Sequence, residues 1–94
     1  MEKSYRVFRT KQADKDFDKI RKSGLPSVKE KVERIFRELA EHPRTGVGNP
    51  EELRHFGANI WSRSLSKKDR VVYEIRDDAV VVLVFQLLGH YDDR

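Results

Sequence analysis

The spacing of the apolar residues changes once along this chain, and that change limits the folds open to it. From Thr10 to Glu41 the apolar residues recur at helical intervals, in two stripes. After Pro50 they occur in short runs rich in β-branched and aromatic residues, which are typical of strands. A strand-like start at residues 4–9 completes the order β-α-α-β-β-β. This order favours an α+β fold, with two antiparallel helices on one face of a mainly antiparallel sheet of about four strands.

The sequence also marks where the two helices begin and end. Thr10 or its neighbour opens the first helix, and Ser23-Gly24 closes it, because glycine is common just past a helix end. The second helix opens near Ser27, which has the spacing of a capping box with Glu30, and stops near Glu41. The apolar stripes are Ala13, Phe17 and Ile20 in the first helix, and Val28, Val32, Ile35, Phe36 and Leu39 in the second.

Three runs in the second half predict strands. Residues 59–65 and 70–76 are expected to form two of them, joined by a polar turn. A two-residue turn at Asp77-Asp78 then leads into residues 79–88, the most apolar run. We expect this run to be a central strand buried on both faces. Residues 51–56 fit either a short helical turn or an extended segment.

Length and composition set further limits. At 94 residues the chain has room for one small domain, spanning residues 1–94. It has no cysteine, which excludes disulfides and thiolate metal sites and fits a reducing compartment. No secretory leader precedes the first strand, and the longest apolar run is too short to cross a bilayer. We therefore expect a cytoplasmic protein with no membrane association.

The basic residues are concentrated in the first half. Residues 1–50 contain 13 Lys and Arg against 8 Asp and Glu, whereas residues 51–94 contain 7 against 8. A basic half suits a polyanionic partner such as RNA, because bound phosphates release their counterions. A solvated helix surface of mixed charge would explain the same count equally well.

Three polar residues near loop or strand ends have the chemistry of a metal-free phosphoryl-transfer site. Glu51 follows Asn49-Pro50, and a proline fixes the direction in which the next side chain is presented, as a base would require. Arg70 offers forked donors that match phosphate oxygens. His90 is the best candidate acid, because histidine titrates near pH ~6.5. Each residue also has an ordinary alternative: an exposed carboxylate, a surface arginine and a C-terminal histidine without a function.

Other residues are weaker candidates. Arg63 lies two positions after Trp61, so it shares that strand face and is a second candidate for phosphate binding. Tyr91 suits stacking on a base or anchoring the C-terminus, and Trp61 is expected in the core. His42 and His55 are scattered in sequence, and without cysteine they make a poor metal site.

Three ordered segments resemble one known family. Residues Gly46 to His55 resemble the G-x-G-x-P-E-x-L-x-H signature of YoeB-like toxins, the Txe/YoeB branch of the RelE/ParE superfamily. Trp61-Ser62-Arg63 with Asp69 to Glu74 resembles their W-S-R and R-L-V-Y segments. Gly89-His90-Tyr91 matches their C-terminal H-Y.

The resemblance implies a RelE-like fold and an endoribonuclease that enters the ribosomal A site and cuts mRNA without a metal or other cofactor. The ribose 2′-hydroxyl attacks the adjacent phosphorus and leaves a 2′,3′-cyclic phosphate and a 5′-hydroxyl. Carried over by motif, Glu51 is the general base, Arg70 stabilises the phosphate and His90 is the general acid. Arg63 and Tyr91 would hold the substrate.

The resemblance also implies partners: a small antitoxin of the YefM/Phd-like or another type, the ribosome with its mRNA, and a second copy of the toxin in a homodimer. Two alternatives remain, a ParE-like toxin of the same fold that targets gyrase and a non-catalytic nucleic-acid-binding module.

The expected register raises a difficulty for the proposed site. A two-residue turn at Asp77-Asp78 would pair Arg70 with Phe85, and strict alternation would then point His90 to the opposite face of the sheet. Arg70 and His90 would converge only if the last strand ended or bulged near Leu88-Gly89, which a glycine permits.

Overall fold

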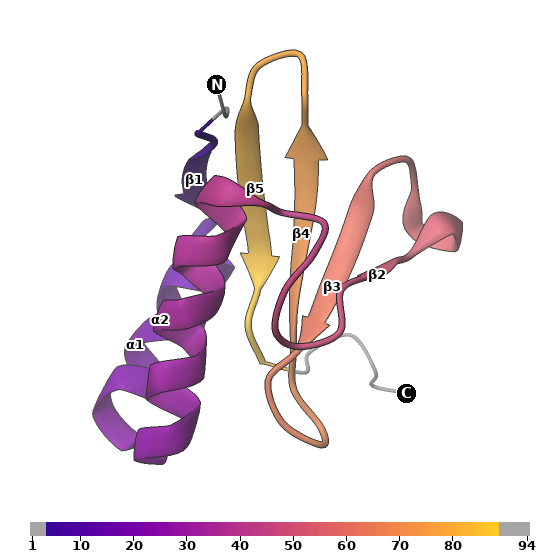
Figure 1. Ribbon diagram of the computed structural model, residues 1–94. Helices are drawn as coiled ribbons and strands as arrows, with labels where there is room; N and C mark the ends of the chain where they lie inside the picture. Colours follow the sequence, from indigo (N-terminus) through magenta and orange to yellow (C-terminus); the bar gives the residue numbers. More distant parts are fainter. Residues whose placement is uncertain (1–3, 89–94) are drawn as a thin grey trace.

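The computed structural model describes residues 4–88, drawn in Figure 1. In this part of the chain the expected α+β fold is confirmed, with five strands in place of about four. The elements are β1 (Arg6–Arg9), α1 (Lys11–Ser23), α2 (Pro26–Glu41), β2 (Glu51–Glu52), the 3-10 helix η1 (Arg54–Phe56), β3 (Ile60–Ser64), β4 (Arg70–Arg76) and β5 (Val81–Gln86). The additional strand is β2, so residues 51–56 contain both of the conformations that the sequence left open.

The five strands form one open sheet in the order β1-β5-β4-β3-β2. Strand β1 runs parallel to β5, and the other neighbours are antiparallel. The last strand is central, as expected, but it is not buried on both faces. Val82 and Val84 have no exposed surface, whereas Val81, Leu83 and Phe85 are only partly buried. The reason is that the two helices cover one face alone.

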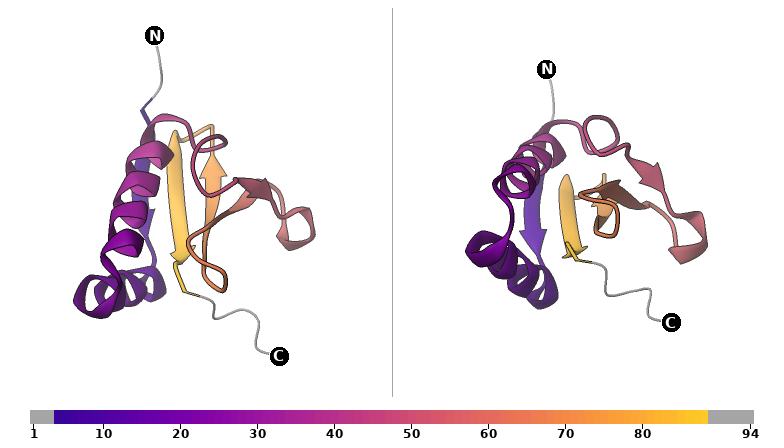
Figure 2. Two further views of the ribbon diagram at one scale, coloured as in Figure 1. Left: turned by 60° about the horizontal axis from the view of Figure 1, so that its bottom comes forward. Right: turned by 90° about the horizontal axis from the view of Figure 1, so that it is seen from below.

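The covered face is divided between the helices and a loop. Helix α1 packs on β5 and α2 lies against β1, while the loop after α2 passes over β4 and β3 (Figures 1 and 2). Phe17 and Phe36 stack across the two helices with their ring centroids 5.7 Å apart. The fully or nearly buried core is Ala13, Ile20, Val32, Ile35, Leu39, Leu65, Val71, Tyr73, Ile75, Val82, Val84 and Leu87.

The two helices begin in different ways. Thr10 caps α1, because its side-chain oxygen accepts a hydrogen bond from the Ala13 N–H at 3.2 Å. The capping box expected at Ser27 and Glu30 is wrong. Leu25 is the residue that precedes α2, and it makes no side-chain cap. Pro26 occupies the first turn, where its fixed φ and missing N–H cost nothing, so Ser27 already lies inside the helix.

The connection between β4 and β5 also differs from expectation. Arg76 pairs with Val81, so the turn has four residues, and Val80 adopts a positive φ of 55° within it. The register then shifts: Tyr73 pairs with Val84, but Val72 pairs with Gln86. The expected pairing of Arg70 with Phe85 is therefore wrong.

This irregularity bears on His90. The alternation that was expected to turn His90 away from Arg70 assumed an unbroken ladder, and the ladder is broken at Phe85 and ends at Gln86. His90 itself, like Tyr91, lies outside the described residues.

Candidate functional site

The glycine-rich turn ahead of β2 has a conformation that most residues avoid. Gly46, Gly48 and Asn49 have φ values of 127°, 84° and 53°. A Cβ at Gly48 would lie 2.9 Å from the Ser64 carbonyl oxygen, and the Ser64 N–H donates to the Gly48 carbonyl at 2.7 Å. Only glycine allows this close approach at that φ. The turn therefore brings Pro50 and Glu51 directly to the edge of β3.

The two neighbouring glutamates point to opposite faces of the sheet. Glu51 pairs with Ser62 and Glu52 pairs with Trp61 across β2 and β3. Because cross-strand partners share a face, Glu51 lies on the face away from the helices, and Glu52 lies on the other. The Glu52 carboxylate is 3.7 Å from Arg54 Nε. The structure thus gives the two carboxylates, which have the same chemistry, different neighbours.

Arg70 lies beside Glu51 on the uncovered face. Its Nη1 is 3.9 Å from the Glu51 Oε1 and donates to the Ser62 Oγ at 3.3 Å. The side chains of Arg70 and Glu51 are 43% and 60% exposed. A carboxylate and a guanidinium at this separation, both reachable from solvent, can act on one ribose-phosphate unit as a proton acceptor and a charge stabiliser.

A depression of about 190 Å³ surrounds this pair, lined by Glu51, Leu53, His55, Phe56, Arg70 and Val72. The His55 ring packs edge-on against Phe56, with the centroids 4.6 Å apart. From the sequence alone, the His55 side chain was considered only as a poor metal ligand. The alternation of Glu51, Leu53 and His55 was a signal that could have joined them to one site.

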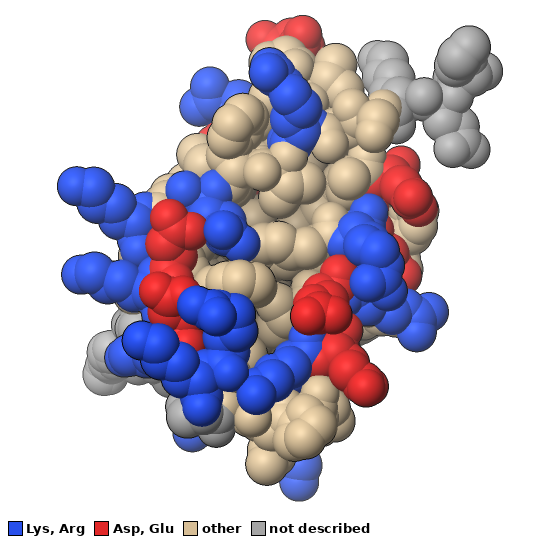
Figure 3. All heavy atoms as spheres, turned by 90° about the vertical axis from the view of Figure 1, so that its left-hand side faces the viewer, with Lys and Arg blue, Asp and Glu red and all other residues tan. Residues whose placement is uncertain are grey.

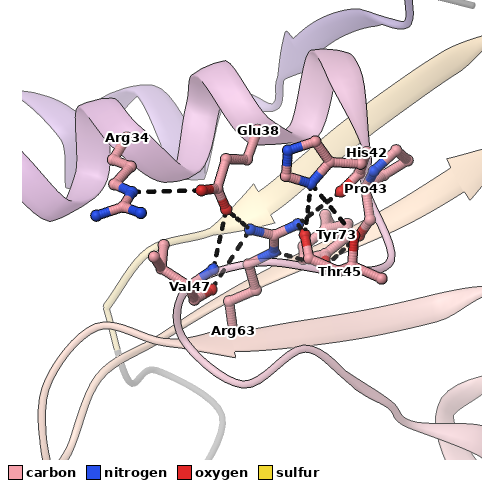
Figure 4. Close-up of polar contacts among 8 residues, drawn as sticks. All are labelled: Arg34, Glu38, His42, Pro43, Thr45, Val47, Arg63 and Tyr73. Carbon is pink, nitrogen blue, oxygen red and sulfur yellow. Dashed lines mark hydrogen bonds and ion pairs between the residues drawn. The ribbon is translucent and has the colours of Figure 1, made fainter. Parts of the chain in front are cut away.

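Arg63 has a different environment from Arg70. The expectation that it shares a face with Trp61 is confirmed, but that face is the covered one, and the side chain of Arg63 has no exposed surface. Figure 4 shows it reaching from β3 to α2 and the loop. All five N–H donors are used, on Glu38 Oε1 (2.7 Å), Val47 O (3.4 Å), His42 O (3.0 Å), Thr45 O (2.8 Å) and Tyr73 Oη (3.2 Å). This burial contradicts a role for Arg63 in holding the substrate.

The buried partners of Arg63 form a connected network. Burial alone would raise the pKa of Glu38, but hydrogen bonds from the Val47 N–H, Arg63 and Arg34, together with the Arg63 charge, lower it overall. Burial raises the pKa of Tyr73, whose hydroxyl donates to the Pro43 carbonyl at 2.8 Å. The network ties α2 and the loop to the sheet, so it supports the glycine-rich turn that positions Glu51.

The end of β5 is the second neighbour of Arg70. Gln86 pairs with Val72, two residues after Arg70. The carboxyl end of β5 and the amino end of β4 therefore lie side by side at the same end of the sheet. His90 follows Gln86 by four residues.

Trp61 packs against the core, as expected. Within residues 4–88, no three His, Asp or Glu side chains are grouped so as to hold a metal ion, and neither helix has the length and apolar character to cross a membrane.

The helices present a surface of mixed charge. Figure 3 views the molecule from the helical side and shows Lys and Arg side chains gathered along both flanks, with Asp and Glu among them. Part of this mixture is paired: Arg21 and Asp18 are 3.0 Å apart, and Arg34 and Glu38 are 3.3 Å apart. The excess of basic residues in the first half is therefore spread over the helical surface and not gathered into one uninterrupted patch.

The comparison with known proteins agrees with the fold and the motifs. The family described as YoeB-like toxin of bacterial type II toxin-antitoxin system matches residues 9–91. Toxin YoeB of Streptomyces coelicolor is 34% identical over 64 residues, which are 68% of this chain and 74% of the relative. Toxin YoeB of Escherichia coli O6:H1 is 31% identical over 55 residues, 58% of this chain and 66% of the relative, slightly less than two thirds of its length.

Solved structures give the same result. The YoeB/ParE toxin from Agrobacterium tumefaciens superposes with a TM-score of 0.81 at 26% identity, covering 92% of this chain and 99% of that one. A chain of the intact E. coli RelBE toxin-antitoxin complex superposes with a TM-score of 0.72 at 25% identity, covering 97% and 100%. From its motifs, its RelE-like sheet and these matches, the chain belongs to the YoeB-like toxins of bacterial type II toxin-antitoxin systems.

Proposed function

We propose that this toxin is a ribosome-dependent endoribonuclease that cuts mRNA in the ribosomal A site without a metal. The observation that carries the proposal is the Glu51–Arg70 pair. The two side chains lie 3.9 Å apart, both exposed, on the uncovered face of the sheet. They lie at the end of the sheet where β5 finishes, and the chain continues from there to His90.

The chemistry follows from the character of each group. The Glu51 carboxylate takes the proton of a ribose 2′-hydroxyl, and the freed 2′-oxygen forms a bond to the adjacent phosphorus. Arg70 donates to the phosphate oxygens, where negative charge increases in the transition state. The bond from phosphorus to the 5′-oxygen breaks, and His90 gives its proton to that oxygen. The products are a 2′,3′-cyclic phosphate and a 5′-hydroxyl, and Tyr91 is proposed to contact the substrate.

The geometry of the free toxin suits this role. The Glu51–Arg70 contact of 3.9 Å is longer than a hydrogen bond, and the Arg70 bond to Ser62 is long at 3.3 Å. Arg70 therefore has little bonding to lose when a phosphate replaces its present neighbours. By contrast, Arg63 has every donor engaged, so it is assigned no contact with RNA.

The ribosome is proposed to supply the positioning that the toxin lacks. General acid-base help contributes only about 10²–10⁴-fold, whereas correct alignment of reactants contributes up to roughly 7–11 kcal/mol in model reactions. The lining of the depression beside Arg70 offers few donors for holding a ribose and phosphate in line. The basic residues of the helices, among them Lys15, Lys19, Lys22, Lys29 and Lys31, are proposed to contact ribosomal RNA.

The relatives suggest the protein partners. Solved neighbours include a YoeB-YefM complex and a YoeB dimer from Staphylococcus aureus, and the E. coli RelBE toxin-antitoxin complex. We propose by analogy that a small antitoxin of the YefM/Phd-like or another type binds this toxin and masks the site, and that the toxin also forms a homodimer. A cytoplasmic location follows from a ribosomal target.

The proposal is tested by incubating the purified toxin with mRNA placed in a ribosomal A site and with the same RNA free in solution, then mapping the fragment ends. We expect far faster cleavage on the ribosome and a 5′-hydroxyl on the downstream fragment. Equal rates on both substrates would remove the ribosome from the mechanism, and a 5′-phosphate would remove the 2′-hydroxyl attack.

Two further arms separate the alternatives. Cleavage is expected to persist in excess EDTA on ribosomes kept intact by a separately set magnesium level, and restoration by trace zinc or manganese would contradict the metal-free mechanism. Inhibition of purified gyrase without any RNA cleavage would favour the ParE-like alternative.

A further inference from the structure

The start of α1 holds the end of β5 through a succession of hydrogen bonds. The Thr10 N–H donates to the Val84 carbonyl at 3.0 Å, and the Thr10 hydroxyl donates to the Phe85 carbonyl at 2.9 Å. The side chain of Gln86 donates to the Leu88 carbonyl at 3.2 Å. These contacts fix the path of the chain past the point where its pairing with β4 ends.

Asp16 makes the last contacts of this series. Its Oδ2 accepts hydrogen bonds from two successive backbone N–H groups, those of Leu87 at 3.0 Å and Leu88 at 3.2 Å. Its Oδ1 accepts a bond from the Gln12 side-chain amide at 3.0 Å. Asp16 has no exposed surface, although it belongs to a helix whose other acidic residues face solvent.

A buried carboxylate at this position needs a physical reason. Leu87 and Leu88 have passed the end of β5, so no neighbouring strand receives their N–H groups, and Leu87 is fully buried. A buried N–H without a partner costs about 1–3 kcal/mol. A carboxylate has enough acceptor sites for both N–H groups and the Gln12 amide, and bonds to an ionised acceptor are stronger than bonds to a neutral one.

The position of these two residues gives the contact a consequence beyond stability. Leu88 is followed at once by Gly89, His90 and Tyr91. We propose that Asp16 is a positioning residue that sets the point and direction from which the segment carrying His90 starts, and that it thereby aligns the general acid with Glu51 and Arg70. This inference rests on the proposed function, in which His90 is the acid.

Asp16 thereby has a role in the reaction, although its helix lies on the far side of the sheet from the Glu51–Arg70 pair. Its alternative is that Asp16 only stabilises the fold. The two are separated by asking whether the effect of Asp16 on cleavage depends on His90. A residue that acts through His90 has little left to affect once His90 is removed, whereas a purely structural residue lowers activity in both backgrounds.

The experiment is a double-mutant cycle on the full chain. Asp16→Ala, Asp16→Asn and the control Asp18→Ala are prepared with His90 intact and with His90→Gln. Asp18 lies on the same helix with a side chain 56% exposed, so its removal leaves the end of β5 untouched. Single-turnover cleavage of A-site mRNA is measured below the unfolding midpoint of every variant.

With His90 present, we expect Asp16→Ala to slow cleavage by about 10–100-fold, the effect of misplacing a catalytic group. In the His90→Gln background the loss should fall to within roughly twofold. Asp16→Asn keeps a side-chain oxygen for the two N–H groups and should retain most of the rate, and Asp18→Ala should match the wild type.

Equal losses from Asp16→Ala in both backgrounds would overturn the inference. If Asp16→Ala does not fold, Gln12→Ala replaces it, with a smaller expected loss that also vanishes without His90.

A second readout does not require activity. The ring signals of isotope-labelled histidine are recorded by NMR, and His90→Gln identifies the His90 signal. We expect Asp16→Ala to shift that signal and to leave those of His42 and His55 in place. An unchanged His90 signal would overturn the inference even for an active toxin. If the wild-type protein cuts no RNA, the proposed function fails, and the NMR comparison still decides whether Asp16 governs the environment of His90.

Discussion

Arg63 and Arg70 belong to adjacent strands of one hairpin, yet they occupy opposite extremes of environment. Arg63 lies on the covered face with no exposed surface and all five donors engaged. Arg70 lies on the uncovered face, 43% exposed, with one long hydrogen bond and one distant carboxylate. An arginine side chain therefore stabilises the fold on one face, whereas another arginine remains available for a ligand on the other face.

This small sheet separates the residues that stabilise the fold from those available for chemistry. On the covered face polar groups are satisfied by one another, and Glu38, Arg63 and Tyr73 connect α2, the loop and the sheet (Figure 4). On the uncovered face Glu51 and Arg70 make few contacts that stabilise the fold.

The largest effect is expected from removing the proposed acid or base. Glu51→Gln and His90→Gln should each slow cleavage of A-site mRNA by about 10²–10⁴-fold, the usual contribution of general acid-base catalysis. Glu51→Gln should not shift the thermal unfolding midpoint appreciably, because the Glu51 side chain is 60% exposed and lies 3.9 Å from Arg70. Single-turnover kinetics and thermal unfolding measure the two effects.

The chain offers matched controls for both residues. Glu52→Gln alters the neighbouring carboxylate on the opposite face, and His55→Gln alters the histidine that lines the same depression. Both variants should cut at close to the wild-type rate. A loss at His55→Gln as large as that at His90→Gln would transfer the role of acid to His55.

On the covered face, Arg63→Met should destabilise the protein by about 3–5 kcal/mol, because it removes the buried counter-ion of Glu38, which is only 13% exposed, and leaves it the exposed Arg34 alone. Urea-induced unfolding measures the loss. Glu38→Gln should lower the free energy of unfolding much less in the Arg63→Met background than in the wild type. In that background the Glu38 carboxylate has already lost its bond to Arg63. Equal costs in the two backgrounds would show that the pair does not act as a unit.

The same network should make stability depend on pH. The pKa of Glu38 is lowered in the folded state, so its contribution to stability is complete above the ordinary pKa of 4.5 and is lost as the pH falls through the folded value. Glu38→Gln should therefore be less stable than the wild type at pH 7, and the difference should shrink below pH 4.5. Urea titrations at a series of pH values provide the measurement, and a difference that stays constant into acid would contradict the assignment.

The smallest effect is expected where an ion pair is short but exposed. Arg44 and Asp77 are 2.7 Å apart, and their side chains are 38% and 49% exposed. Arg44→Ala should cost only about 0–1 kcal/mol, and less at high salt, because water and ions already screen the pair. A loss comparable to that of Arg63→Met would show that distance, and not burial, sets the strength of these contacts.

The parts of the fold that depend on local patterns were predictable. Helical periodicity located α1 and α2, and the strand-like run after Asp69 located β4. The grouping of Glu51 with Arg70 came from the family resemblance. The motifs carried the family. The start of α2 was predicted wrongly because Ser27 and Glu30 have the spacing of a capping box, although Pro26 just before them is also typical of a first helical turn. In the structure the helix begins at Pro26.

Long-range register could not be predicted from local patterns. The four-residue turn before Val81 and the shift beside Val72 are settled by packing between strands. The burial of Arg63 could not be read either, because an alternating strand shows which residues share a face but not which face the helices cover. The role of Asp16 depends on contacts across 71 and 72 residues. A single aspartate on a charged helix carries no local signal for this.

The most direct test of the division between the two faces is the single-turnover cleavage rate of Arg70→Ala on A-site mRNA, measured with its urea unfolding midpoint. Arg70 is partly exposed, so its loss should cost no more than about 0–1 kcal/mol of stability. Cleavage should nevertheless fall by about 10²–10³-fold, the loss typical of removing a donor that stabilises transition-state charge. A folded Arg70→Ala toxin that cuts at the wild-type rate would contradict the account, because the uncovered face would then not be the site of the reaction.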